Sequence, residues 1–190
     1  VLPFKTDSDV CVAERLAGEL RDSSSEPVMA DGGSFYSYDD TVGTWDKIHP
    51  LDIHRAINRY DGAWLTLANR GMKVSTRMRN SVIETLRTQC ESAEDGGFFA
   101  NARTGFQFTN GFVQVDKTGM RITPSSADNR ARHMNAWEFN REEPAPRWTQ
   151  FLEDIFPGAP DTHIAMQEFF GAAIIGAATS LQKCLVLTGV

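Results

Sequence analysis

The sequence has few of the features that mark secreted, membrane-spanning or disulfide-linked proteins. Its three cysteines lie far apart and form no CxxC pair, so we expect reduced thiols rather than a disulfide framework. The longest apolar stretch, over residues 169–178, is too short to cross a bilayer. No signal peptide opens the chain, because Lys5, Asp7 and Asp9 interrupt any apolar segment there. These absences favour a cytoplasmic protein that has no membrane partner.

Catalytic and metal-binding patterns are also missing. His49 and His54 are five residues apart, so on a helix their side chains would diverge by roughly 140°. His133 and His163 have no carboxylate or histidine at ligand spacing. The chain contains no G-x-S-x-G motif, no complete G-x-G-x-x-G motif and no reactive cysteine context. We therefore expect no catalytic residue, no metal site and no cofactor here; metal analysis would test the alternative of a metal-dependent hydrolase.

Charge is unevenly distributed along the chain. The net charge of -6 argues against a free-standing basic nucleic-acid binder. Residues 1–60 carry 11 acidic and 6 basic side chains, whereas residues 61–135 carry 7 acidic and 10 basic ones. The middle of the chain is therefore the part that suits a phosphate backbone, with weak binding when it acts alone.

Two small basic groups are the candidate nucleic-acid-binding residues. The first basic group is Arg70, Lys73, Arg77 and Arg79, and the second basic group is Arg130 and Arg132. Phosphate contacts need only cationic side chains on a common surface. The alternative is that these residues form ordinary solvated surface. Nearby aromatic side chains offer stacking surfaces for bases, although we expect at least half of them to fill a hairpin core: Phe35, Tyr36, Tyr38 and Trp45.

The first half of the chain predicts helices and one aromatic hairpin. Apolar residues at helical spacing follow a Ser8 or Asp9 cap and stop at the polar run 22–25. Aromatic and β-branched residues flank a turn-rich segment at 39–43, which predicts a β-hairpin. A short helix is expected after His49-Pro50. A longer helix, capped by Ser75 or Thr76, is expected to run to the Asp95-Gly96-Gly97 stop.

The second half predicts short strands and then two helices. Strands are expected at Phe112–Val115 and near Trp137–Phe139, and Pro146 marks a helix start. A further helix is expected from about Asp161 to Ala178. Because it is apolar almost all round from Phe169 onward, we expect it to be buried on several sides.

The final run KCLVLTGV reads as a buried strand ending in Thr188-Gly189, which is how a phosphate-binding loop begins. The segment before it resembles the lead-in to the Walker A motif of phage and plasmid primase–helicases. These are superfamily 3 helicases of the satellite-phage type, with poxvirus primase–helicases as distant relatives. The matching residues are Pro146, Arg147, Trp148, Phe151, Leu152, Gln167, Glu168, Gly171, Gln182 and Lys183.

The resemblance extends upstream to three further segments. TDSDVCVAERLAGEL resembles the family's opening segment, FYSYDDTVGTW its aromatic hairpin ending in Trp45, and NGFVQVDKTGMRITPSS its Asn-Gly strand. The resemblance implies an α+β module over 1–140 and a helical collar or linker over 141–182. It also implies that 183–190 is the first strand of an AAA+-like ATPase domain, cut before the phosphate loop.

The resemblance also implies a function. We expect a domain that flanks the helicase motor, supports hexamer assembly and guides DNA, with an upstream primase domain as a further partner. ATP and Mg would act in the parent protein, in the host-cell cytoplasm, and residues 1–190 alone would not hydrolyse ATP. The alternative is an assembly module with no DNA contact of its own.

Overall fold

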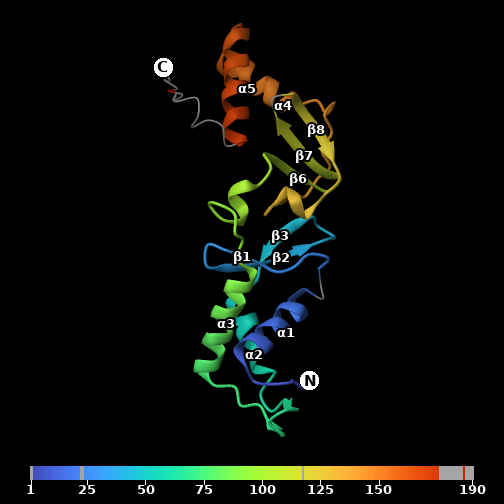
Figure 1. Ribbon diagram of the computed structural model, residues 1–190. Coiled ribbons are helices and arrows are strands. Elements are labelled where there is room, and N and C mark those ends of the chain that lie inside the picture. Colours follow the sequence, from blue (N-terminus) through green and yellow to red (C-terminus); the bar gives the residue numbers. More distant parts are fainter. Residues whose placement is uncertain (1, 22–23, 117, 176–185, 187–190) are drawn as a thin grey trace.

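The computed structural model describes residues 2–21, 24–116, 118–175 and Val186. Figure 1 shows helices at the N-terminal end, then two sheets, then a pair of helices. The fold mixes α and β structure, in agreement with the predicted α+β class. Within the described ranges, no helix has both the length and the apolar character that a membrane crossing needs. The predicted final strand, including Thr188 and Gly189, lies outside the described residues except for Val186.

Three helices form the lobe at the N-terminal end: α1 (Asp9–Arg21), α2 (Pro50–Asn58) and α3 (Thr76–Cys90). Their apolar faces meet in one core, where Leu16, Ile57 and Leu86 are fully buried. Burial of each such side chain contributes about 1.5–3 kcal/mol, which exceeds what the short helices gain from intrinsic propensity. Tertiary packing therefore fixes the helices.

The helix caps explain where α2 and α3 begin. His49 Nδ1 accepts a hydrogen bond from the Leu51 amide at 3.2 Å, and Ser75 Oγ accepts one from the Met78 amide at 3.2 Å. Both predicted helix starts are thus confirmed. The predicted stop of α3 at Asp95-Gly96-Gly97 is wrong, because α3 ends at Cys90. Glu91 turns extended and forms a parallel bridge with Ala30, which takes the chain away from the helix axis.

The predicted aromatic hairpin is confirmed. It forms the antiparallel sheet β1 (Met29–Asp31), β2 (Ser34–Asp39) and β3 (Thr44–Lys47), in that order. Asp39 Oδ1 accepts from the Thr41 amide at 2.8 Å, which fixes the turn. Tyr38, Trp45 and Phe98 pack in a buried cluster above the helical core. A second small hairpin, β4 (Trp64–Leu65) with β5 (Arg70–Gly71), was not predicted.

The second sheet has the order β8-β7-β6-β9. Its strands and the adjacent 3-10 turns are η1 (Phe98–Asn101), β6 (Gly105–Phe108), β7 (Gly111–Asp116), β8 (Gly119–Thr123), η2 (Ala127–Asn129) and β9 (Met134–Asn135). The predicted strand at Phe112–Val115 is confirmed as part of β7. The strand predicted near Trp137–Phe139 is wrong, since β9 ends at Asn135. The Asn110 side chain instead holds this segment through bonds to the Phe139 amide and carbonyl, both at 2.9 Å.

The last described elements are α4 (Pro146–Ile155) and α5 (Pro160–Ile174). The helix start at Pro146 is confirmed. The expectation that α5 is buried on several sides is wrong for the described residues. Phe170 is 38% exposed and Ile174 is 67% exposed, although the Phe170 ring meets the Trp148 ring of α4 edge to face at 5.7 Å. The predicted C-terminal end of this helix, near Ala178, lies outside the described residues.

Candidate nucleic-acid interface

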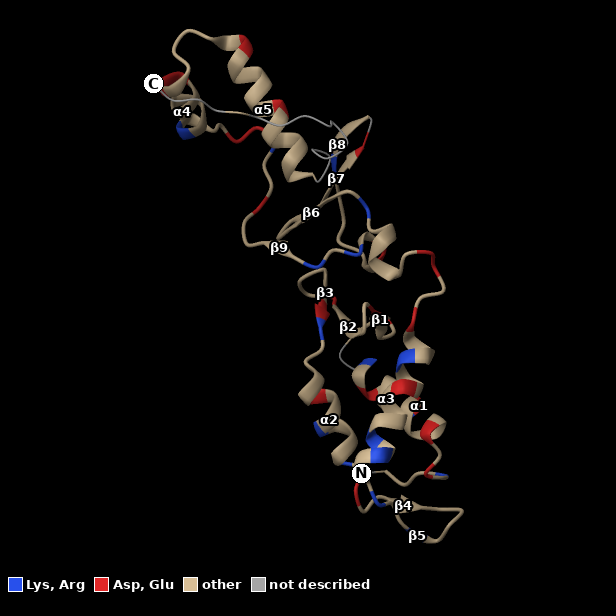
Figure 2. Ribbon diagram, turned by 90° about the vertical axis from the view of Figure 1, so that its left-hand side faces the viewer, with Lys and Arg blue, Asp and Glu red and all other residues tan. Residues whose placement is uncertain are grey.

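The six predicted basic residues occupy two separate parts of the molecule. The first basic group spans β5, the connecting segment and the first turn of α3: Arg70, Lys73, Arg77 and Arg79. The second basic group, Arg130 and Arg132, lies in the segment between η2 and β9. Figure 2 shows Lys and Arg at both places, with the sheet β1–β3 between them. The sequence prediction of two groups therefore corresponds to two surfaces rather than one.

Half of the first basic group is engaged within the protein. Arg70 Nη2 forms a 2.6 Å ion pair with Asp7 Oδ2, which ties β5 to the N-terminal segment. Arg79 donates to Asn58 Oδ1 at 3.1 Å and to Thr76 Oγ1 at 3.0 Å, which joins the end of α2 to the start of α3. Arg70 and Arg79 thus stabilise the local structure that carries Lys73 and Arg77.

Lys73 and Arg77 are the available cations of the first basic group. Both side chains are exposed, and neither forms an ion pair with any residue that the structure describes. An exposed ammonium and guanidinium in this state can approach a phosphate without first breaking an internal bond. The first basic group therefore offers two free cations and two that are already bonded.

Arg130 is the most firmly held residue of the second basic group. Its guanidinium binds both carboxylate oxygens of Glu94, with Nη2 to Oε1 at 2.7 Å, and donates to the Phe98 carbonyl. It also lies over the Phe98 ring, 4.4 Å from the centroid. The Arg130 hydrogen bond, followed by one from Asn101, lowers the pKa of Glu94 to about 2. Arg130 thus anchors the segment between η2 and β9.

Arg132 is exposed beside this anchor, and its guanidinium lies 4.9 Å from the centroid of Phe99. It borders a cavity of about 330 Å³ between β6 and the segment before β9, which we call the β6–β9 cavity. Sequence reasoning missed Arg103, which lines the same cavity, and the exposed His133 next to it. The two missed residues are 30 positions apart in the sequence. The parallel pairing of β6 with β9 and the 3.3 Å bond from the Arg103 amide to the Asn129 carbonyl bring their segments together.

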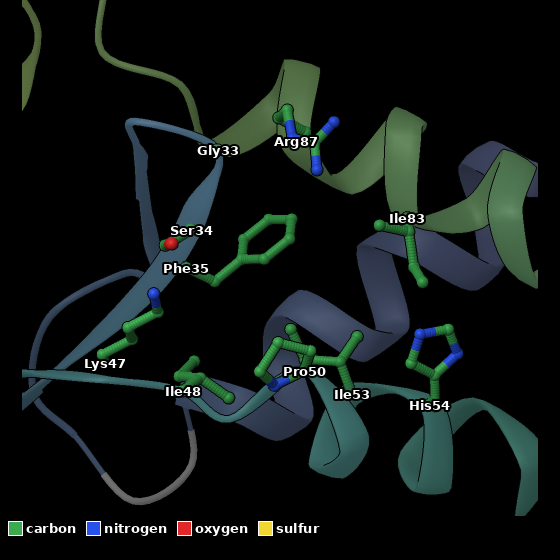
Figure 3. Close-up of a pocket in the computed structure, with 10 residues that line it drawn as sticks. All are labelled: Gly33, Ser34, Phe35, Lys47, Ile48, Pro50, Ile53, His54, Ile83 and Arg87. Carbon is green, nitrogen blue, oxygen red and sulfur yellow. The ribbon is translucent and has the colours of Figure 1, made fainter.

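A second cavity, of about 250 Å³, lies between β2, β3, α2 and α3. Figure 3 shows the Phe35 ring at its centre, with Ile83 on the opposite wall. Lys47, His54 and Arg87 stand around its edge, and Arg87 forms a 2.7 Å ion pair with Glu84. The prediction that at least half of the four hairpin aromatics fill a hairpin core is confirmed by Tyr38 and Trp45, whereas the buried Phe35 packs in the helical core. No local pattern in the sequence indicated this cavity.

The histidines do not gather at one site. His49 caps α2, His54 borders the cavity between β2, β3, α2 and α3, and His133 borders the β6–β9 cavity. His163 Nε2 lies 2.8 Å from the Phe156 carbonyl oxygen. Among the described residues, no three His, Cys, Asp or Glu side chains are placed to hold a metal ion. The chemistry that the surface offers is therefore that of cations, aromatic rings and amides.

The chain matches a known protein family over most of its length. Residues 13–157 match the family described as D5 N terminal like, which is the N-terminal region of phage and plasmid primase–helicase proteins. Comparison with curated proteins gives no match. Because the matched residues cover more than half of the chain, the chain belongs to the D5 N-terminal-like family.

Proposed function

From this family membership, we propose that the chain flanks the ATPase motor of a DNA replicative primase–helicase, where it guides DNA and supports hexamer assembly. Family membership supports the replication context. The observation that carries the DNA-guiding role is that three cations of the two basic groups, Lys73, Arg77 and Arg132, are exposed and form no ion pair among the described residues, in a chain of net charge -6. On a protein of net negative charge, local positive charge favours contact with phosphate only where such cations lie.

The contact is electrostatic and therefore weak and sensitive to salt. Each phosphate that a cation neutralises releases counterions, so the logarithm of the affinity falls with the logarithm of the salt concentration. In this proposal the superfamily 3 motor, with ATP and Mg²⁺, supplies the work in the host cytoplasm, and this domain aligns the strand with it.

Fluorescence anisotropy with labelled single-stranded and duplex oligonucleotides tests the DNA-guiding role. We expect measurable binding at low salt that the double variant Lys73→Gln/Arg77→Gln weakens by about fivefold or more. The matched control is Arg141→Gln, which removes one exposed arginine outside both basic groups. If the double variant and all four substitutions of the first basic group leave the titration unchanged, these cations do not contact DNA.

A second candidate function is an assembly module that makes no DNA contact. The observation that favours it is the exposed apolar surface of α4 and α5, where Phe151, Ile155, Ile164 and Ile174 are 46%, 51%, 54% and 67% exposed. Exposed apolar side chains in this number are typical of protein contacts. Light scattering with and without DNA separates the two candidates: assembly that does not respond to DNA, with no anisotropy change, favours the second.

A further inference from the structure

β4 is the middle strand of a small sheet at the end of the N-terminal lobe. On one side it pairs with β5, where Trp64 stands opposite Gly71. On the other side the chain at Phe4 runs parallel to it, because the Phe4 amide donates to the Trp64 carbonyl at 2.8 Å and the Thr66 amide donates to the Phe4 carbonyl at 2.9 Å. Figure 2 shows β4 and β5 beyond α1, α2 and α3, close to the N-terminal segment. We call this three-stranded unit the β4 sheet.

The two faces of the β4 sheet differ in burial. Phe4, Leu65 and Met72 are 2%, 0% and 3% exposed and belong to the helical core. Trp64 precedes the buried Leu65 on β4 and is 50% exposed. Because successive side chains along a strand point to opposite faces, Trp64 lies on the solvent face. Gly71 has no side chain, so β5 places nothing directly opposite the indole ring on that face.

The same alternation places one lysine on each side of Trp64. Lys5 follows the buried Phe4, and Lys73 follows the buried Met72, so both lysines lie on the solvent face. Lys73 is two positions beyond the partner of Trp64, and diagonal neighbours of this kind are about 7–8 Å apart, within reach of long side chains. Both lysines are exposed, and neither forms an ion pair among the described residues.

The acidic side chains of the segments that form the β4 sheet are already engaged. These side chains are Asp7 and Asp61. Asp7 pairs with Arg70 at 2.6 Å, and Asp61 Oδ1 accepts a hydrogen bond from the Val74 amide at 2.8 Å. The two bonds also hold the sheet to the segments on either side of it. A surface that is fixed in this way loses little conformational entropy when a ligand binds.

We propose that Trp64 stacks on an unpaired base of single-stranded DNA, while Lys5 and Lys73 bind the phosphates on either side of that base. Every base has a flat face that stacks on an aromatic ring, so the contact tolerates any sequence. The bases of a duplex are already stacked on one another, so the site selects single strands. This inference rests on the proposed DNA-guiding function and specifies the form of DNA that the domain guides.

The lysines favour a nucleic acid over a protein partner. An exposed Trp is common in both kinds of interface, whereas Lys is depleted in protein–protein interfaces. Single-strand binding surfaces combine cations that follow the backbone with aromatic rings that stack on the bases. Trp64 between Lys5 and Lys73 has this combination.

Fluorescence anisotropy with a labelled dT dodecamer, alone and annealed to its complement, tests the stacking contact. Trp64→Ala should weaken single-strand binding about fivefold or more and leave duplex binding unchanged. Trp64→Phe, which keeps an aromatic ring, should retain most of the affinity. The matched control is Trp137→Ala, which removes a 68% exposed indole outside the β4 sheet and should leave both titrations unchanged.

The salt dependence separates stacking from charge. Trp64→Ala removes no cation, so the slope of log affinity against log salt should equal that of the wild type. Lys5→Gln should instead make the slope shallower by about 0.7, because one phosphate is no longer neutralised. A loss of affinity that comes only from local unfolding at Trp64 would also change the slope, since the lysines beside it would be displaced.

Two results would overturn the stacking site. One is single-strand binding that Trp64→Ala leaves unchanged; if this variant then alters self-association in light scattering, Trp64 contacts protein instead. The other is equal weakening of single-strand and duplex binding, which would show that no unpaired base is involved. If Lys73→Gln/Arg77→Gln still weakens DNA binding in either case, the proposed function stands and only the stacking site is lost.

Discussion

The first basic group is continuous in sequence, from Arg70 to Arg79, whereas the β6–β9 cavity gathers its cations from two distant segments. In the first group, internal bonds already engage Arg70 and Arg79, so the number of free charges is half of the sequence count. At the cavity, Arg130 is engaged in the same way, but Arg103 adds a free charge that the sequence did not indicate. The sequence therefore overstates the number of free cations on the first surface, whereas at the cavity it predicts the right number, two, but names Arg130 in place of Arg103.

The two regions also differ in the residues that surround their cations. Around Lys73 and Arg77 the structure offers exposed cations, which suits a phosphate backbone of any sequence. At the β6–β9 cavity, the segment that carries Arg130 and Arg132 is tied to the hairpin, because Trp45 donates to the Ala127 and Ala131 carbonyls.

The largest effect on this comparison is expected from Trp45→Ala. Trp45 is 3% exposed, packs on Tyr38 and Phe98, and anchors the segment that carries the second basic group. Loss of a buried Trp costs about 3–5 kcal/mol of unfolding free energy. Urea denaturation should show this loss and little change, within about 0.5 kcal/mol, for the half-exposed control Trp64→Ala. Equal losses in the two variants would show that the Trp45 cluster does not hold the second sheet.

Arg130→Gln is expected to have the next largest effect. It removes the ion pair with Glu94, the bond to the Phe98 carbonyl and the contact with the Phe98 ring. We expect a melting temperature lower by about 2–4 °C, since about 1 kcal/mol produces such a shift in a domain of this size. Arg132→Gln removes an exposed guanidinium and its contact with the Phe99 ring but no ion pair among the described residues, so it should lower the melting temperature less than Arg130→Gln does. The same decrease in both variants would contradict the anchoring role of Arg130.

The Glu94–Arg130 pair also predicts a pH dependence. Because the pKa of Glu94 is lowered from 4.5 to about 2 in the folded state, its contribution to stability is present above pH 4.5. That contribution is lost as the pH falls from 4.5 towards 2. Thermal melts of the wild type and Glu94→Gln should therefore differ at neutral pH and converge in this window. Glu138→Gln, which alters another exposed carboxylate, should run parallel to the wild type; a constant gap for Glu94→Gln would contradict the pairing.

Local sequence signals predicted the elements that local interactions fix. Ser75 was one of two expected caps and accepts the capping bond, and the turn after Asp39 follows from its side-chain bond to Thr41. The helix starts at Pro50 and Pro146 follow from proline chemistry at the first helical turn. In each case the deciding partner lies within a few residues along the chain.

The sequence predictions were wrong where the residue that decides the local structure is distant along the chain. Asn110 holds Phe139 from 29 positions away, and the bridge to Ala30 ends α3 before the glycines do. Likewise, Arg130 finds Glu94 across 36 positions, so its engagement could not be read from the local pattern. The order β8-β7-β6-β9, which builds the cavity, depends on a parallel pairing that no short spacing encodes.

The most direct test of the central claim is the salt dependence of single-strand binding by the wild type and Lys73→Gln/Arg77→Gln. If these two cations bind phosphates, the slope of log affinity against log salt should become shallower by about 0.7 for each phosphate that is no longer neutralised. The control Arg141→Gln should keep the wild-type slope. An unchanged slope in the double variant would contradict the account, because DNA would then be held by something other than the free cations of the first basic group.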